Sequence, residues 1–348
     1  MKTWAASIFL LAGLAIAQSS QSLQDVQSAI QRKDYATALR IVRPLAQGGD
    51  AAAQTILGSM YALGYGVSRS SPEAVNWFRK AAEQGQPVAE GNLGIAYLGG
   101  QGVKQSYSEA LNWLRKAADQ NDAQAEANLG AMYARGNGVK KDPAQAVLWY
   151  RKAADQGFAG AQYSVGIAYA NGVGVPKNDA EAVNWFRKAA EQGIAEAQAN
   201  LGLAYAIGLG VAKNPAESVK WASKAAQRGI PQGQESLRGL AEEGYAPAQN
   251  ELGLTYEKGW GSLKIDAEAV NWYRKAAEQK FAAGQFNLGR MYAAGKGTRQ
   301  SDVEAYKWFA LAAAQGNQDA RKQMAEVAKR LTAEELAQAK QAAKQTSR

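Results

Sequence analysis

Small and apolar residues recur along this chain at the spacing of one face of an α-helix. Ala53, Leu57 and Tyr61 lie at positions i, i+4 and i+8, which places them on a single stripe. A Gly-x-Gly turn formed by Gly64 and Gly66 ends this stretch, and glycine readily adopts the left-handed conformation that closes a helix. The pattern predicts an amphipathic helix, termed helix A, followed by a tight turn.

A second helical pattern, termed helix B, follows each turn. Ala74 and Trp77 lie at i and i+3 of its apolar stripe. Later copies begin with Asp142, Asn214 or Ser301, each of which is followed three residues later by Glu or Gln. This spacing is typical of a helix N-terminus, and proline at the first helical position supports it in two of the three cases. Each unit is therefore predicted to be a pair of helices.

The pair of helices repeats every 36 residues. Five units follow one another over 50–229, and two more occupy 245–316. Between these blocks, 230–244 reads as a repeat that has lost its middle, so we expect it to stack differently from the others. The sequence predicts an all-α protein, a right-handed α/α solenoid of helix–turn–helix repeats.

The repeat motif resembles that of a known family. Its first half has the form A-x-x-x-L-G-x-x-Y-x-x-G-x-G-V and its second half A-x-x-W-x-x-K-A-A-x-x-G, a pattern similar to Sel1-like repeats, which are related to the tetratricopeptide repeats. The resemblance implies a bacterial scaffold or adaptor that binds proteins or peptides through a concave face lined by the A helices. Departures from the motif are local. Asn121 and Lys280 replace the glycine that closes the unit, Ser218 replaces the helix B alanine, and Ser262 and Thr298 replace the turn valine.

The two ends of the chain differ from the repeats. A solenoid needs terminal units with one polar face, so 18–49 is predicted to be an N-terminal helical cap and 317–348 a set of C-terminal capping helices with a basic tail. Residues 1–17 combine Lys2, an apolar run and a final Ala-Ile-Ala, which is typical of a cleaved signal peptide. An uncleaved anchor is the alternative. After cleavage no transmembrane segment is expected, so the protein would be periplasmic or secreted, in a Gram-negative bacterium.

Composition limits the chemistry available to the chain. It has neither histidine nor cysteine, so the usual general base, thiol nucleophile and zinc ligands are missing. We predict no catalytic residue, no metal and no cofactor. The resemblance raises one enzymatic alternative, β-lactam binding or hydrolysis, but the sequence has no Ser-x-x-Lys or Lys-Thr-Gly motif, only the adjacent Ser223-Lys224.

Charge adds a second alternative. The formal net charge is +9, which could attract an anionic cell-wall or exopolysaccharide polymer, although acids and bases alternate and no nucleic-acid partner is expected. Bases and acids also recur together on helix B, as Arg79 and Glu83 do. This spacing predicts an i, i+4 ion-pair ladder.

Partner specificity should lie in the residues that differ between repeats. Three helix A positions, each four residues apart, vary most along the stack and share one helical face. An apolar strip with a polar edge would suit an extended peptide or a partner helix, although the same side chains could instead simply cover the next helix A. Trp260, in a turn, is a second candidate contact, although it could instead pack over the irregular segment 230–244. The predicted partner-binding residues are Arg135, Tyr163, Ile167, Asn171, Leu203, Ile207 and Trp260.

Overall fold

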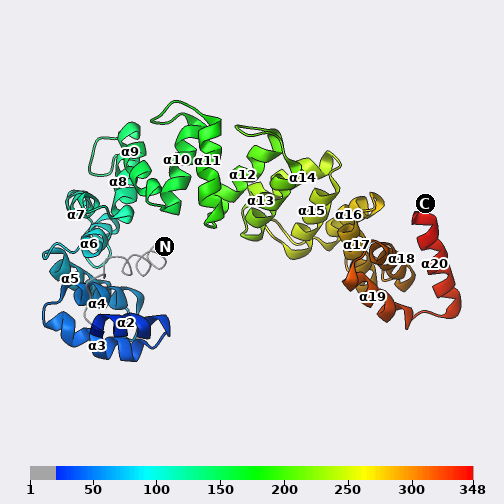
Figure 1. The fold of residues 1–348 in the computed structure, drawn as a ribbon, viewed down its shortest axis with the longest axis horizontal. Helices are drawn as coiled ribbons and strands as arrows, with labels where there is room; N and C mark the ends of the chain where they lie inside the picture. The colour runs from blue at the N-terminus through cyan, green and yellow to red at the C-terminus, as the bar shows by residue number, and fades with distance from the viewer. Residues whose placement is uncertain (1–20, 348) are drawn as a thin grey trace. The chain divides into compact units, whose positions relative to one another are not determined.

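The computed structural model describes residues 21–347, which contain helices and no strands. The chain forms two compact units, one ending at Lys177 and the other beginning at Asn178, and Figure 1 shows the helices that make them up. The predicted signal peptide, residues 1–17, lies outside the described residues and stays a prediction. The prediction of an all-α repeat solenoid is confirmed.

The N-terminal unit consists of consecutive antiparallel helix pairs. Its first pair precedes the repeats, and the unit ends with the helix A of the fourth repeat. Its helices are α2 (Gln21–Gln31), α3 (Tyr35–Gln47), α4 (Ala51–Leu63), α5 (Ser71–Ala82), α6 (Pro87–Gly99), α7 (Tyr107–Asp119), α8 (Ala123–Arg135), α9 (Pro143–Asp155) and α10 (Ala159–Asn171).

The C-terminal unit begins with the helix B of the fourth repeat. One helix, α14, stands where a full repeat would supply two. The helices are α11 (Asp179–Glu191), α12 (Ala195–Ile207), α13 (Pro215–Gln227), α14 (Pro231–Glu242), α15 (Ala246–Lys258), α16 (Asp266–Glu278), α17 (Ala282–Ala294), α18 (Asp302–Ala314), α19 (Gln318–Ala328) and α20 (Ala333–Ser347).

The helix ends follow the predicted local signals. The side chains of Asp142, Asn214 and Ser301 each accept a hydrogen bond from the backbone N–H three residues later. Helix A ends at a left-handed glycine, such as Gly64 with φ 77°. Asn121 and Lys280, which follow helix B where the first repeat has Gly85, also adopt the left-handed conformation, with φ 61° and 60°.

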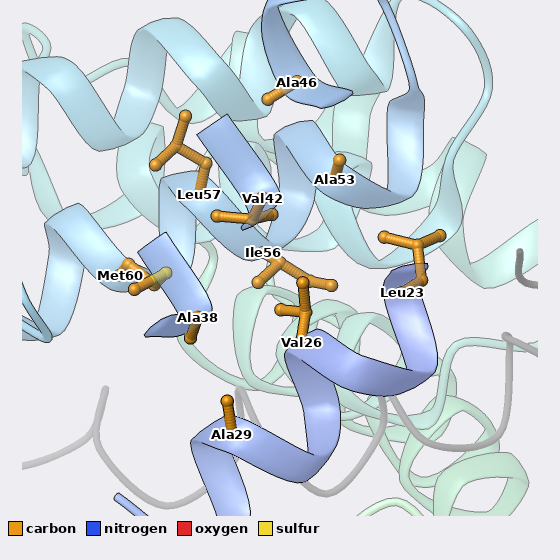
Figure 2. Packing of buried hydrophobic residues seen from close by; sticks show 10 residues of the cluster. All are labelled: Leu23, Val26, Ala29, Ala38, Val42, Ala46, Ala53, Ile56, Leu57 and Met60. Carbon is orange, nitrogen blue, oxygen red and sulfur yellow. The ribbon is translucent and has the colours of Figure 1, made fainter. Parts of the chain in front are cut away.

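Close packing joins the helices of each pair. The glycine at the eighth position of helix A lies under a large side chain of helix B, since a Cβ on Gly58 would be 2.7 Å from the ring of Phe78. At the N-terminal end, Val26 of α2, Val42 of α3 and Ile56 of α4 meet in one apolar cluster (Figure 2). The core is therefore a row of small clusters, each shared by neighbouring helices.

Recurrent hydrogen bonds join successive repeats. The guanidinium group of Arg79 donates to the Tyr97 hydroxyl of the next helix A (3.2 Å), and five other arginines make the same bond to a tyrosine 18 residues further on. The predicted Arg–Glu ladder along helix B is wrong, because the tyrosine offers an acceptor across the interface where an exposed ion pair would add little.

The unpaired helix α14 packs on the helix before it and on the helix after it through the same kinds of contact that regular repeats make. A Cβ on Gly233 would lie 2.7 Å from Ala226 N, a close approach of the kind that helix A makes to the preceding helix B. Arg238 donates to the Tyr256 hydroxyl (2.6 Å), as the arginine of helix B does in regular repeats. The segment therefore packs on both neighbours through contacts that regular repeats use, although it supplies one helix where a repeat supplies two.

Candidate functional site

The exposed stripe of helix A is displaced from the one that the sequence predicted. Counting from the first residue of each helix A, the predicted stripe was positions 5, 9 and 13. Position 5 is largely buried, as Thr55 (4% exposed) and Asn250 (5% exposed) show. Tyr163, at the same position of the fourth repeat, is half-buried and lines the pocket described below. Positions 9 and 13 face outward in the middle repeats.

A pocket opens on the helix A surface of the N-terminal unit. Its volume is about 360 Å³, and it lies between α9 and α10 with one residue from α8. Tyr163, Ile167 and Asn171, three of the predicted binding residues, lie along one wall. The remaining residues are mostly apolar: Ala134, Lys141, Pro143, Ala146, Val147, Tyr150, Ser164, Ala168 and Val173.

Two cations border this pocket. Lys141 is exposed and lines it directly. Arg135 does not line it but lies near Tyr150: burial raises the pKa of the Tyr150 hydroxyl, and the positive charge of Arg135 partly opposes this rise. The adjacent carboxylate of Asp142 accepts a bond from Gln145 N (3.0 Å) and caps α9. The pocket thus combines an apolar floor with a positively charged rim.

The other predicted residues lie in the C-terminal unit. Leu203 and Ile207 of α12 are 43% and 61% exposed, and Leu209 in the following turn is 41% exposed. These side chains form an apolar surface of their own. Trp260 is half-buried in the turn after α15, where its neighbour Leu263 is 80% exposed.

The prediction missed two groups of residues on this face. Position 6 of helix A is polar in six of the seven repeats, and its serine in the fourth repeat, Ser164, lines the pocket. The middle residue of the Gly-x-Gly turn also reaches the pocket, as Val173 does, with 51% exposure. The regular recurrence of Asn92, Asn128, Asn200 and Asn287 was a signal in the sequence.

The described residues hold no set of side chains suited to metal binding, since no group of three His, Cys, Asp or Glu side chains converges there. Nor does any helix among residues 21–347 combine the length and apolar character needed to cross a bilayer. Ser223 and Lys224 do not meet as a nucleophile and base, because the Lys224 amine lies over the Trp221 ring, 4.5 Å from its centroid.

Comparison with known proteins gives a consistent result. The model of the Sel1 repeat matches seven segments: 51–86, 87–122, 123–158, 159–194, 195–230, 246–281 and 282–317. No curated protein matches the chain. Among solved structures, a Sel1 repeat protein from Oxalobacter formigenes is 30% identical with a TM-score of 0.56, over 74% of this chain and 97% of that one.

A second solved structure is c5321, described as a protective antigen present in uropathogenic Escherichia coli strains and displaying an SLR fold. It is 32% identical over 90% of this chain and 79% of that one, with a TM-score of 0.43. An immunity protein of Pseudomonas aeruginosa, Pa5087, is 23% identical over 70% of this chain and 82% of that one, with a TM-score of 0.33.

Proposed function

Because this chain belongs to the Sel1 repeat family, whose solenoids generally serve as protein-interaction scaffolds, we propose that it is an exported, non-enzymatic scaffold that binds a partner polypeptide in the pocket between α9 and α10. The pocket carries the proposal, since it is concave, mostly apolar and lined in part by residues that differ from repeat to repeat, such as Tyr163, Ile167 and Val173. Specific recognition requires such residues, because the recurring positions are already occupied by packing.

The size of the pocket defines the kind of segment that it accepts. A cavity of about 360 Å³ is at the lower end of the range for binding pockets, which suits one or two aliphatic or aromatic side chains. Tyr163 and Tyr150 supply aromatic walls, and large aromatic residues contribute strongly to binding at interfaces. The bound segment would be extended or helical, with one apolar anchor in the pocket.

The test is site-specific photo-crosslinking of the mature protein in cell-envelope extract. A photoreactive residue replaces Val173 at the pocket edge. The captured partner is identified and its contacting segment synthesised as a peptide. We expect Ile167→Ala to weaken peptide binding about tenfold, the loss expected of a small hot-spot residue, while Leu203→Ala on α12 leaves binding unchanged.

Two results would contradict the proposal. One is a peptide that binds the Ile167→Ala variant as tightly as the parent, with circular dichroism showing both folded. The other is capture that disappears at moderate salt for every variant, which would favour an anionic polymer over an apolar anchor. Mass spectrometry of the exported protein tests the location, because cleavage after Ala17 leaves Gln18 as the first residue.

A further inference from the structure

The direction of the repeats changes at α14. In the seventh repeat the Gly-x-Gly turn lies beside the start of the preceding helix B, so a Cβ on Gly297 would be 2.2 Å from Asp266 O. In the sixth repeat a Cβ on Gly261 would be 3.3 Å from Ile230 O, at the start of α14. The fifth repeat has its turn at the other end of α14, because Lys213 pairs with Glu243 (2.9 Å).

These contacts place the turns of the fifth and sixth repeats at opposite edges of the C-terminal unit. The reason is that α12 and α15 are three helices apart instead of two, and successive helices are antiparallel. Helix A of the sixth and seventh repeats therefore runs opposite to α12. For a helix pair to point the opposite way and still pack on its neighbours as before, the whole pair must be rotated by half a turn about the axis along which the repeats stack.

The half turn also exchanges the two sides of the solenoid. A position that holds helix A before the reversal holds helix B after it, which is why α14 packs on α13 as a helix A and on α15 as a helix B. The helix A surfaces of α15 and α17 consequently lie on the opposite side from that of α12. The C-terminal unit has two separate helix A surfaces.

The second surface carries an arginine held in a fixed orientation. Arg290 donates through Nη2 to Glu257 Oε2 (2.8 Å) and through Nε to Asn287 Oδ1 (3.2 Å). Its guanidinium group lies 5.9 Å from the centre of the Phe286 ring, a cation–π distance. The side chain is 35% exposed, and within residues 21–347 no acceptor is bonded to Nη1.

A buried carboxylate holds this arginine in place. Glu257 is 8% exposed and also accepts a bond from the Tyr273 hydroxyl (2.7 Å). Burial raises the pKa of Glu257, but the bonds from Tyr273 and Arg290 outweigh this and bring it below its usual value. Five other repeats have alanine at the equivalent position and one has leucine, so the buried charge is particular to this place in the chain.

A second cation lies beside the first. Lys258 is 47% exposed and its Nζ is 3.5 Å from Glu257 Oε1. Two positive groups thus share Glu257 as their negative partner, and the half-buried Glu251 on the same helix accepts a bond from Asn250 (3.1 Å). A guanidinium fork fixed by its neighbours recognises a carboxylate with little loss of side-chain entropy.

We infer that the helix A surface of α15 and α17 is a second binding surface, selective for a polypeptide segment that carries carboxylate groups, with Arg290 as its anchor. It acts independently of the pocket between α9 and α10 and of the apolar surface on α12. One chain can then hold two partners of different chemistry.

The experiment uses fluorescence anisotropy on the mature protein with a labelled octapeptide of alternating alanine and glutamate, compared with its glutamine counterpart. The informative variant is the double substitution Glu257→Gln with Arg290→Gln, which removes both charges of the pair and leaves the net charge unchanged. We expect it to bind the acidic peptide about tenfold more weakly. Lys141→Gln, which removes a cation from the other pocket, should have no such effect.

Arg290→Lys separates geometry from charge, since it keeps the cation and loses the fork. We expect an intermediate loss of about threefold to fivefold. The inference is overturned if the double variant binds the acidic peptide like the parent, if the glutamine peptide binds equally well, or if Lys141→Gln causes the larger loss. None of these outcomes affects the Ile167→Ala test of the proposed function.

Discussion

The glycine at the eighth position of helix A shows how a single side chain limits this fold. The place of its missing Cβ lies under a ring in several repeats, 2.7 Å from Phe78 at Gly58 and 2.7 Å from Tyr273 at Gly253. Real Cβ atoms do not approach other atoms so closely. The two helices of a pair can therefore touch only where this residue stays glycine.

Gly58→Ala should destabilise the protein by about 1–3 kcal/mol, because the added methyl forces the Phe78 ring out of its buried position. Urea unfolding followed by circular dichroism measures the change. Gly239→Ala is the matched control, since its Cβ would meet no atom within 4 Å, and alanine is favoured over glycine inside a helix by about 0.5–1 kcal/mol. A similar loss for both variants would contradict the argument.

The N-cap Asp122 links stability to pH. Burial raises its pKa despite the backbone bonds from Ala125 and Gln124. The folded state then holds this proton more tightly than the unfolded chain, so the contribution of the group is fully present below its unfolded pKa and is lost as pH rises through the folded value. Ionised Asp122 costs stability at neutral pH.

Asp122→Asn should therefore be more stable than the parent at pH 7, and the difference should shrink as pH falls toward about 4. Asparagine keeps the oxygen that accepts from Ala125 N. Thermal unfolding across this pH range is the measurement. The same substitution at the N-cap Asp142 controls for the general effect of asparagine there, and a gain that grows on acidification would refute the assignment.

Individual helices show which parts of the fold can be predicted from the sequence. Helices and turns were predictable because caps, glycines and apolar spacing act within a few residues. The role of α14 was not, because it depends on contacts to both neighbours, such as the bond from Gln234 to Ser262 Oγ (2.9 Å), which ties the turn where valine is missing.

The candidate site also has features that nearby residues determine and features that depend on contacts between helices. Tyr163, Ile167 and Asn171 share one pocket, as their spacing of four predicted. The burial of position 5 and the separation of Leu203 and Ile207 into another compact unit could not be read from spacing, because both depend on how whole helices stack.

The last helix, α20, closes the C-terminal end of the solenoid. It packs on α18, where Ala339 is fully buried in the cluster around Phe309 and Leu336 is partly buried beside it. Arg330 forms a two-pronged ion pair with Asp302 just before α20, and Lys280 donates to Ser347 O at its end (3.1 Å). Most of its remaining surface is exposed.

Deleting residues 333–348 should lower stability by roughly 2 kcal/mol or more, because it exposes apolar surface on α18 that one leucine and several alanines cover. Denaturant unfolding of the truncated protein measures this. Replacing only the exposed Lys340 and Lys344 with glutamine leaves the buried face intact and should change stability little. Equal stability of the truncated and full-length proteins would show that α20 does not act as a cap.

At the scale of the whole chain, each repeat is stabilised mainly by contacts with the repeats next to it. Hydrogen bonds between helices recur at fixed short separations, such as 18 residues from arginine to tyrosine and 30 residues from Gln279 to Gln249. Among residues 21–347, the helices that pack extensively on one another are adjacent along the chain or separated by a single helix. Damage to one repeat is therefore felt mainly by the repeats beside it.

Because α14 is a single helix, the copies of helix A in the C-terminal unit run in two opposite directions, one before it and one after it. Every regular step between copies of helix A spans an even number of helices and preserves direction, whereas the step from α12 to α15 is odd and inverts it. A second odd step anywhere in the C-terminal unit would restore a one-sided array, whatever its length. Within this unit, partners bound at two helix A sites lie on the same side when the step between the sites is even. They lie on opposite sides when the step is odd.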